Sequence, residues 1–95
     1  MVTNLRTALD EHLSEPFPPS VEKGSEYGGI DCVMVGSDIY GWSMQIAQGK
    51  SLRADDRARF ETLKNELVAA LPAFPAEARS YYERLVELAD LALRS

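Results

Sequence analysis

The stretch DCVMVGSDIYGWSMQIAQ, residues 31–48, decides the fold because its apolar side chains recur at helical spacing. Steps of three, four, three and four residues place one set of them on a single helix face. That set consists of Cys32, Val35, Ile39, Trp42 and Ile46. The spacing predicts a central helix over residues 31–48. A short strand near residues 30–35 is the alternative for its start, since these residues also alternate in polarity.

Small residues lie beside that apolar face. Gly29, Gly36 and Ser43 recur every seven residues, so they fall on one line along the predicted helix. Small side chains at these positions predict the close approach of a second helix.

Helical spacing predicts two amphipathic helices on either side of this central one. The first covers residues 4–13, with Thr3 or Asn4 as its N-cap. The second covers residues 53–71 and stops at Pro72, which cannot continue a helix. The expected core face of the second helix is Phe60, Leu63, Leu67, Val68 and Leu71.

The last predicted helix covers residues 75–93 and begins at Pro75, whose fixed φ suits a first helical turn. It forms an antiparallel hairpin with the preceding helix, because only a few residues connect the two. A chain of 95 residues is long enough for one hydrophobic core. The expected fold class is therefore all-α, with a single compact four-helix domain over residues 1–95.

A long Pro- and Gly-rich loop over residues 14–30 joins the first two predicted helices. Its three prolines and three glycines break both helix and strand. Connections of this length are uncommon in compact domains and tend to be functional or disordered. Phe17, Val21 and Tyr27 are expected to pack on the core and to hold the loop as an ordered cover.

Negative charge is concentrated in one part of the chain. The whole chain has a net charge of −5, whereas residues 10–38 carry seven acidic residues against Lys23 alone, a net charge of −6. Phosphate backbones and anionic lipids bind basic surfaces, so nucleic acid and membrane are not expected partners. The acidic residues either keep a small protein soluble or attract a basic protein.

The sequence predicts no membrane span, secretion signal or cofactor. The longest uninterrupted apolar run, residues 67–74, is shorter than the roughly 20 residues that a spanning helix needs. Asp10 and Glu11 lie where a secretion signal would be apolar. The single cysteine, Cys32, agrees with a reducing compartment and is interpreted as a core residue. We expect a cytoplasmic chain without a metal site, since His12 is the only histidine.

Asp31 and Asp38 are the two carboxylates of most chemical interest, because they would share one edge of the predicted central helix, about 10 Å apart. That separation is too long for a shared proton, and no motif of nucleophilic catalysis accompanies them. The favoured roles are an N-cap for Asp31 and a hydrogen-bond acceptor for Asp38 if it is buried. We expect no enzyme; a small-ligand binder or an enzyme using these two residues is an alternative.

The charge pattern favours a small acidic protein-interaction module that binds a basic partner, such as an adaptor, an inhibitor or an antitoxin- or immunity-like protein. The expected contact residues are apolar anchors inside an acidic rim. They are Phe17, Glu22, Glu26, Tyr27, Asp31 and Asp38. The alternative is a structural homodimer, whose interface would include Val86 and Leu91. The sequence identifies no catalytic, cofactor-binding or metal-binding residue.

Overall fold

The apolar residues at helical spacing form four helices, and a short β-hairpin precedes the second of them. The computed structural model describes residues 4–95. The helices are α1 (Leu5–Ser14), α2 (Met34–Ala47), α3 (Ala54–Ala70) and α4 (Arg79–Leu93). The expected all-α, four-helix fold class is confirmed.

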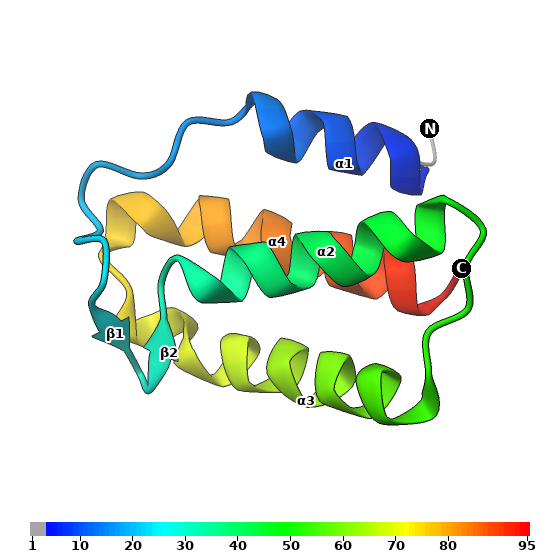
Figure 1. Cartoon of the computed structure of the whole chain (residues 1–95). Coiled ribbons are helices and arrows are strands. Elements are labelled where there is room, and N and C mark those ends of the chain that lie inside the picture. The colour runs from blue at the N-terminus through cyan, green and yellow to red at the C-terminus, as the bar shows by residue number, and fades with distance from the viewer. Residues whose placement is uncertain (1–3) are drawn as a thin grey trace.

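Successive helices run in opposite directions along the bundle. In Figure 1, α1 and α3 lie at its two edges, with α2 and α4 between them. The last helix, α4, contacts each of the other three. The helix α2 also contacts each of the other three. The predicted antiparallel hairpin of the last two helices is therefore present, and α2 and α4 together form the centre of the bundle.

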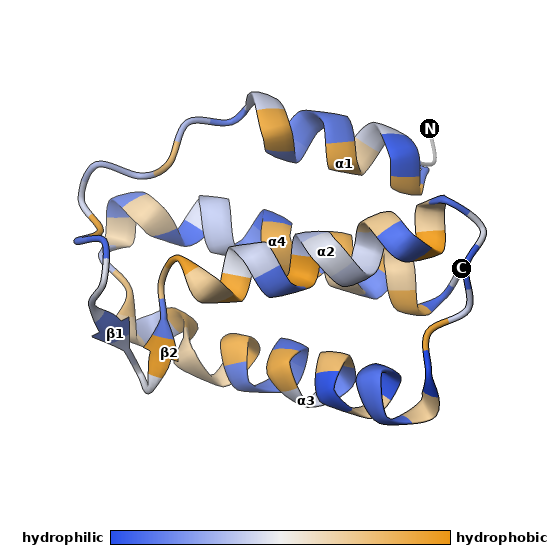
Figure 2. Ribbon diagram, viewed as in Figure 1, coloured by the Kyte–Doolittle hydropathy of each residue, from blue (hydrophilic) through white to orange (hydrophobic). Residues whose placement is uncertain are grey.

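One hydrophobic cluster joins all four helices. Ile39 of α2, Phe60 of α3 and Tyr82 of α4 are each 0 % exposed, so the core extends through the middle of the bundle. The Tyr82 hydroxyl donates a hydrogen bond to the carbonyl of Cys32 over 2.8 Å, which ties α4 to the segment before α2. The ribbon of α2 carries few hydrophilic residues, whereas the first turns of α3 are hydrophilic (Figure 2).

Asn4 caps α1, and it was one of the two residues predicted for this role. Its side-chain oxygen accepts a hydrogen bond from the N–H of Thr7 over 2.8 Å. This bond satisfies one of the free N–H groups of the first turn. Thr3, the other candidate, lies outside the described residues.

The helix α2 begins at Met34, three residues later than predicted. One carboxylate oxygen of Asp31 accepts hydrogen bonds from the N–H groups of Val33 and Met34, both over 2.9 Å. The strand alternative is right for Ile30 and Asp31 only, because these two residues pair with a neighbouring strand. The N-cap residue of α2 is Val33, so Asp31 is not the N-cap that was predicted, but its carboxylate accepts N–H groups at the helix start from two residues before the cap.

Two short strands, β1 (Glu26–Tyr27) and β2 (Ile30–Asp31), pair antiparallel inside the segment predicted as a loop. The two turn residues, Gly28 at φ +60° and Gly29 at φ +83°, adopt the left-handed backbone that a two-residue hairpin favours. A Cβ added at Gly28 would lie 2.9 Å from the Cβ of Ala70. The hairpin turn therefore packs directly on the end of α3.

The close packing predicted for the line of small residues is wrong at its glycines. A Cβ added at Gly29 or Gly36 would meet no atom within 4 Å. Gly28, which is outside that line, has the close contact instead. Ser43, the third member, is fully buried in the core.

The remainder of the predicted loop is anchored as expected. Val21 is buried, and Phe17 and Tyr27 pack against the core cluster. The ring of Tyr27 stacks on Phe74 with centroids 5.1 Å apart. The loop thus covers one end of the bundle instead of projecting from it.

The connection between α3 and α4 holds two short 3-10 turns, Leu71–Ala73 and Ala76–Ala78. The sequence predicts a last helix from Pro75, but α4 begins four residues later, at Arg79. Prolines in this connection lack the N–H groups that a continuous helix needs. The Arg79 side chain instead donates to the carbonyl of Phe74 over 3.2 Å and stabilises the turn.

Val68 is 45 % exposed, and its predicted place on the core face of α3 is wrong. The buried residues of α3 are Phe60, Leu67 and Ala70. Because successive helix residues are rotated by about 100°, the residue after Leu67 turns out of the core.

Candidate protein-interaction site

Three of the four exposed large apolar side chains found among residues 4–95 lie where α1 ends and α2 begins. Leu13 is 65 % exposed, Val33 37 % and Met34 55 %, whereas the fourth, Val68, lies on α3. A single exposed apolar residue is ordinary on a protein surface, but a group of them marks an interaction site. The end of α1 and the start of α2 are therefore the first candidates.

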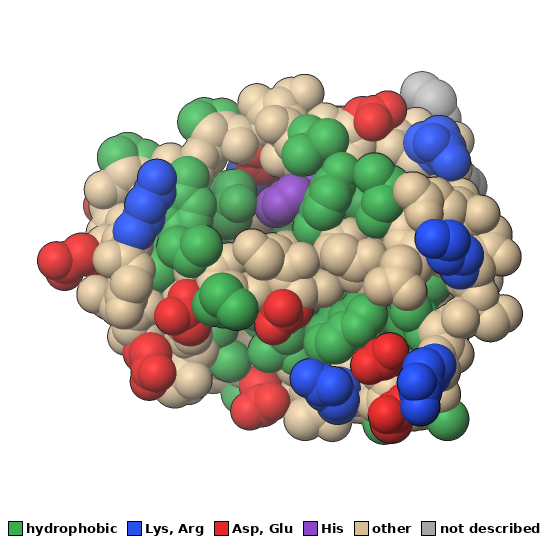
Figure 3. All heavy atoms as spheres, in the orientation of Figure 1, with side chains coloured by type: hydrophobic (Ala, Val, Ile, Leu, Met, Phe, Trp, Pro, Cys, Tyr) green, Lys and Arg blue, Asp and Glu red, His purple; other side chains and the backbone are tan. Residues whose placement is uncertain are grey.

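A groove separates these two helix ends and has a volume of about 250 Å³. We call it the α1–α2 groove. It is lined by His12, Leu13, Phe17, Cys32, Val33, Gly36, Ser37, Tyr40 and Tyr81. Figure 3 shows hydrophobic side chains gathered around the single histidine on this face. Gly36 leaves the wall open, because a Cβ placed there would meet no atom within 4 Å.

Four rings of the groove lining form a continuous aromatic row. The centroid of His12 lies 5.9 Å from that of Tyr40 and 5.6 Å from that of Tyr81. Tyr81 in turn meets Phe17 edge to face, with centroids 5.9 Å apart. These separations are within the range at which aromatic rings interact favourably.

Each ring of the aromatic row comes from a different part of the chain. His12 is in the last turn of α1, Phe17 in the following loop, Tyr40 in the middle of α2 and Tyr81 near the start of α4. An ion pair fixes the end of α1 against α4, because Nε of Arg84 donates to Glu15 Oε2 over 2.8 Å. The row is therefore assembled by packing of the bundle.

The aromatic row is uncharged at neutral pH. Burial lowers the pKa of His12 below its usual value of 6.5, although the nearby Glu15 carboxylate opposes this effect. Burial and the same carboxylate raise the pKa of Tyr81 above 10.0. Neutral rings present a negative π face, which attracts cations.

A cation already lies on one of these rings. The Lys23 ammonium is 5.5 Å from the centroid of the Phe17 ring. Lys23 is also the single basic residue of the acidic segment 10–38. The Phe17 ring, at one end of the row, is thus contacted by the chain's own lysine.

The structure places the predicted contact residues in different surroundings. Glu22 and Glu26 are exposed, and Phe17 is half-buried in the α1–α2 groove. Tyr27 is half-buried and packs inward, and its hydroxyl accepts the N–H of Glu22 over 3.0 Å. Phe17 therefore has the position of an interface anchor, whereas Tyr27 supports the loop.

Asp31 and Asp38 are not brought together on one helix edge as predicted, because Asp31 precedes α2. Asp38 is exposed, so the condition for its predicted buried role is not met. It lines a second groove, of about 370 Å³, between α2 and α3. The lining of this α2–α3 groove is Asp38, Trp42, Ala58, Arg59, Thr62, Leu63 and Glu66. Asp31 is engaged with the first N–H groups of α2.

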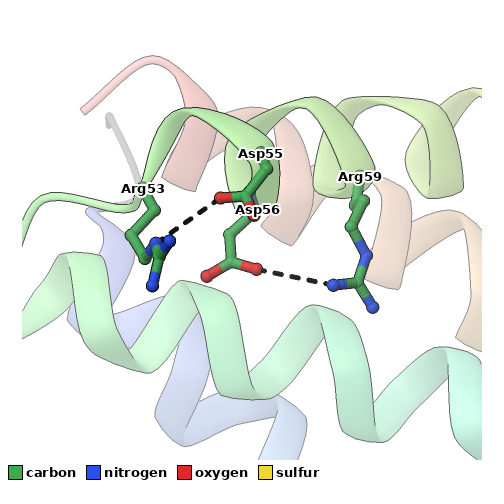
Figure 4. A network of polar contacts seen from close by, with 4 residues as sticks. All are labelled: Arg53, Asp55, Asp56 and Arg59. Carbon is green, nitrogen blue, oxygen red and sulfur yellow. Dashed lines mark hydrogen bonds and ion pairs between the residues drawn. The ribbon is translucent and has the colours of Figure 1, made fainter.

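The charges beside the α2–α3 groove compensate one another. Arg59 lies 3.7 Å from a carboxylate oxygen of Asp56, and Arg53 lies 3.6 Å from one of Asp55, as Figure 4 shows. Both aspartates are in the first turn of α3, where the helix dipole favours negative charge. These pairs are a structural feature of the start of α3, and the groove beside them is mixed in charge.

Cys32 is buried, as predicted, and its Sγ donates to the carbonyl of Glu22 over 3.2 Å. Within residues 4–95, no three side chains of His, Cys, Asp or Glu are grouped so that they could hold a metal ion. None of the helices described is long and apolar enough to cross a membrane.

Sequence reasoning missed most of the α1–α2 groove. Its lining residues Leu13, His12 and Tyr81 were not among the predicted contact residues. What places them together is the approach of α1 to both α2 and α4. The exposed pair Val33 and Met34, next to the capping Asp31, follows from where α2 begins. No spacing within one element encodes that arrangement.

Comparison of the chain with protein-family models, curated proteins and solved structures found no match.

Proposed function

We propose that this chain is a small acidic protein-interaction module, of the adaptor or inhibitor kind, whose α1–α2 groove binds a basic amphipathic segment of a partner protein. The observation that carries the proposal is the exposed group of Leu13, Val33 and Met34 around a groove inside the acidic part of the chain. Elsewhere in residues 4–95, the one exposed large apolar side chain is Val68 on α3.

The apolar group supplies the affinity. Burying a leucine side chain that is mostly exposed contributes about 1.5 to 3 kcal/mol. Leu13, the most exposed of the three, is expected to contribute most on binding. Leu13 and Val33 also line the groove itself, so a partner segment seated there would cover both side chains.

The charge around the groove selects the partner. Residues 10–38, which supply most of the groove lining, carry a net charge of −6. The groove lining itself contains no carboxylate; Glu22 and Glu26 are exposed on the loop after α1, and Asp10 and Glu11 line a separate hollow beside the end of α1. Charge complementarity of this kind raises the association rate and suppresses acidic competitors.

An amphipathic helix has the required shape, because side chains at helical spacing place apolar groups on one face and lysines on its flanks. The experiment uses a fluorescein-labelled peptide of about 14 leucine and lysine residues in that pattern. A second peptide replaces every lysine by glutamate and keeps the leucines. We expect fluorescence anisotropy to report binding of the first peptide alone, weakening as salt is raised to about 500 mM.

Two matched variants locate the site. Leu13→Asp is expected to weaken the complex at least tenfold, which corresponds to about 1.4 kcal/mol. Val68→Asp makes the same exchange at an exposed position on α3 and is expected to leave the affinity unchanged. Equal effects of the two variants, or no saturable binding of the Leu/Lys peptide, would contradict the proposal.

Self-association is the competing outcome. Val86 and Leu91, the residues predicted for a homodimer interface, are half-buried, and Leu91 lines a small hollow between α1 and α4. Sedimentation of the free chain tests this alternative. A dimer that Leu13→Asp dissociates would assign the groove to a second copy and overturn the proposal of a basic partner.

A further inference from the structure

We infer that the aromatic row His12, Tyr40, Tyr81 and Phe17 is the subsite for one cationic side chain of the partner, and that Lys23 occupies part of it in the free chain. This inference rests on the proposed function and names what the groove recognises. The cation is an ammonium or guanidinium group, which a basic segment supplies.

The geometry favours a cation over an aliphatic group. Four rings from four parts of the chain line one groove, with neighbouring centroids between 5.6 and 5.9 Å apart. Each neutral ring carries a negative π face, which attracts a cation. Burial lowers the pKa of His12, so its ring is neutral at pH 7 and does not repel a cation.

The contact of Lys23 with Phe17 supports the cation subsite independently of the ring geometry. Its ammonium lies 5.5 Å from the Phe17 centroid, within the about 6 Å over which a cation and a ring attract. Phe17, one ring of the row, therefore already contacts the kind of group that we assign to the partner.

Lys23 can be displaced. It is exposed, and within residues 4–95 it makes no ion pair with a carboxylate. A cation–π contact at an exposed site is weak, and it holds a long, flexible side chain in one place. Binding of a partner cation would release that side chain.

Removing Lys23 should therefore strengthen cation binding in two ways, by freeing the ring face and by removing a like charge. Lys50→Gln is the matched control, because Lys50 is exposed and follows α2, outside the groove lining. Both variants lose one positive charge, but only Lys23→Gln uncovers Phe17. Both positions are on the surface, so neither exchange disturbs the core.

The probes are choline and its uncharged isostere 3,3-dimethylbutan-1-ol, each titrated against the full chain and followed by the NMR signals of the His12, Tyr40 and Tyr81 rings. We expect saturable shifts with choline and none with the alcohol. Lys23→Gln is expected to tighten choline binding at least about threefold, and Lys50→Gln by less than about 1.5-fold.

Three results would overturn the inference: equal shifts with both probes, no saturable choline shift, or equal gains for the two lysine variants. The Leu/Lys peptide separates this failure from that of the proposed function. If the peptide still binds in a manner sensitive to Leu13→Asp, the groove binds basic segments but the aromatic row does not select the cation. If the peptide does not bind either, both proposals fall.

Discussion

At the scale of single residues, Asp31 sets where α2 begins. One of its carboxylate oxygens accepts the first two free N–H groups of the helix, from Val33 and Met34. Asp31→Ala should lower the free energy of unfolding by about 1 kcal/mol, because those N–H groups lose their acceptor. Asp38→Ala, an exposed carboxylate within the same helix, should change it by less than about 0.5 kcal/mol. Urea denaturation measures both, and equal losses would refute the capping role.

His12 couples the stability of the bundle to pH. Its pKa in the folded chain is lowered from 6.5, so the unfolded chain takes up the proton first as the pH falls. Stability therefore decreases as the pH drops below about 6.5 and levels off once the folded chain is protonated as well. His12→Gln should remove this part of the pH dependence, so that its loss of stability between about pH 7.5 and 5.5 is smaller than that of the parent chain. An identical loss in both chains, measured by urea denaturation, would show that His12 is not desolvated.

At the scale of elements, the β1–β2 hairpin depends on two glycines for different reasons. Gly29 has φ +83° and open space around it, so Gly29→Ala should cost only the backbone penalty of roughly 1 to 2 kcal/mol. Gly28 has φ +60° and also packs against Ala70. A Cβ added at Gly28 would lie 2.9 Å from the Cβ of Ala70, which is too close. Gly28→Ala should therefore cost at least about 1 kcal/mol more. Thermal unfolding of the two variants measures the difference, and a smaller loss for Gly28→Ala would mean that the turn does not pack on α3.

The helices themselves were predictable from spacing, because each element buries one face and its apolar residues must follow that face. Their ends were less predictable. Asp31 and Pro75 each look like first-turn residues, but the pairing of β2 and the 3-10 turns before Arg79 shift both starts. Pairing between strands depends on the partner strand, which the local sequence of α2 does not contain.

The candidate site was predictable only in its charge and in Phe17. The acidic segment is a property of composition and needs no fold to be counted. The contact of His12 with Tyr40 and Tyr81 joins three helices, so it exists only once the bundle has formed. Tyr27 was expected both to pack on the core and to contact a partner, and its stacking on Phe74 bears out the first of these expectations.

At the scale of the whole molecule, the acidic segment 10–38 lies mainly at one end of the bundle. On the face seen in Figure 3, most basic side chains lie toward the end of the bundle where α3 begins. The acidic segment 10–38 forms the end of α1, the loop with its hairpin and the start of α2. Under the proposed function, this charge would guide a basic partner to the end of the molecule that holds the α1–α2 groove.

The central claim is that this groove, and no other surface, receives a basic amphipathic segment. Titrating the isotope-labelled chain with the Leu/Lys peptide, and following every backbone amide by NMR, tests it most directly. We predict that the largest shifts fall on the residues that line the groove, which are His12, Leu13, Phe17, Cys32, Val33, Gly36, Ser37, Tyr40 and Tyr81. Shifts centred on α3, around Val68 or the α2–α3 groove, would contradict the account.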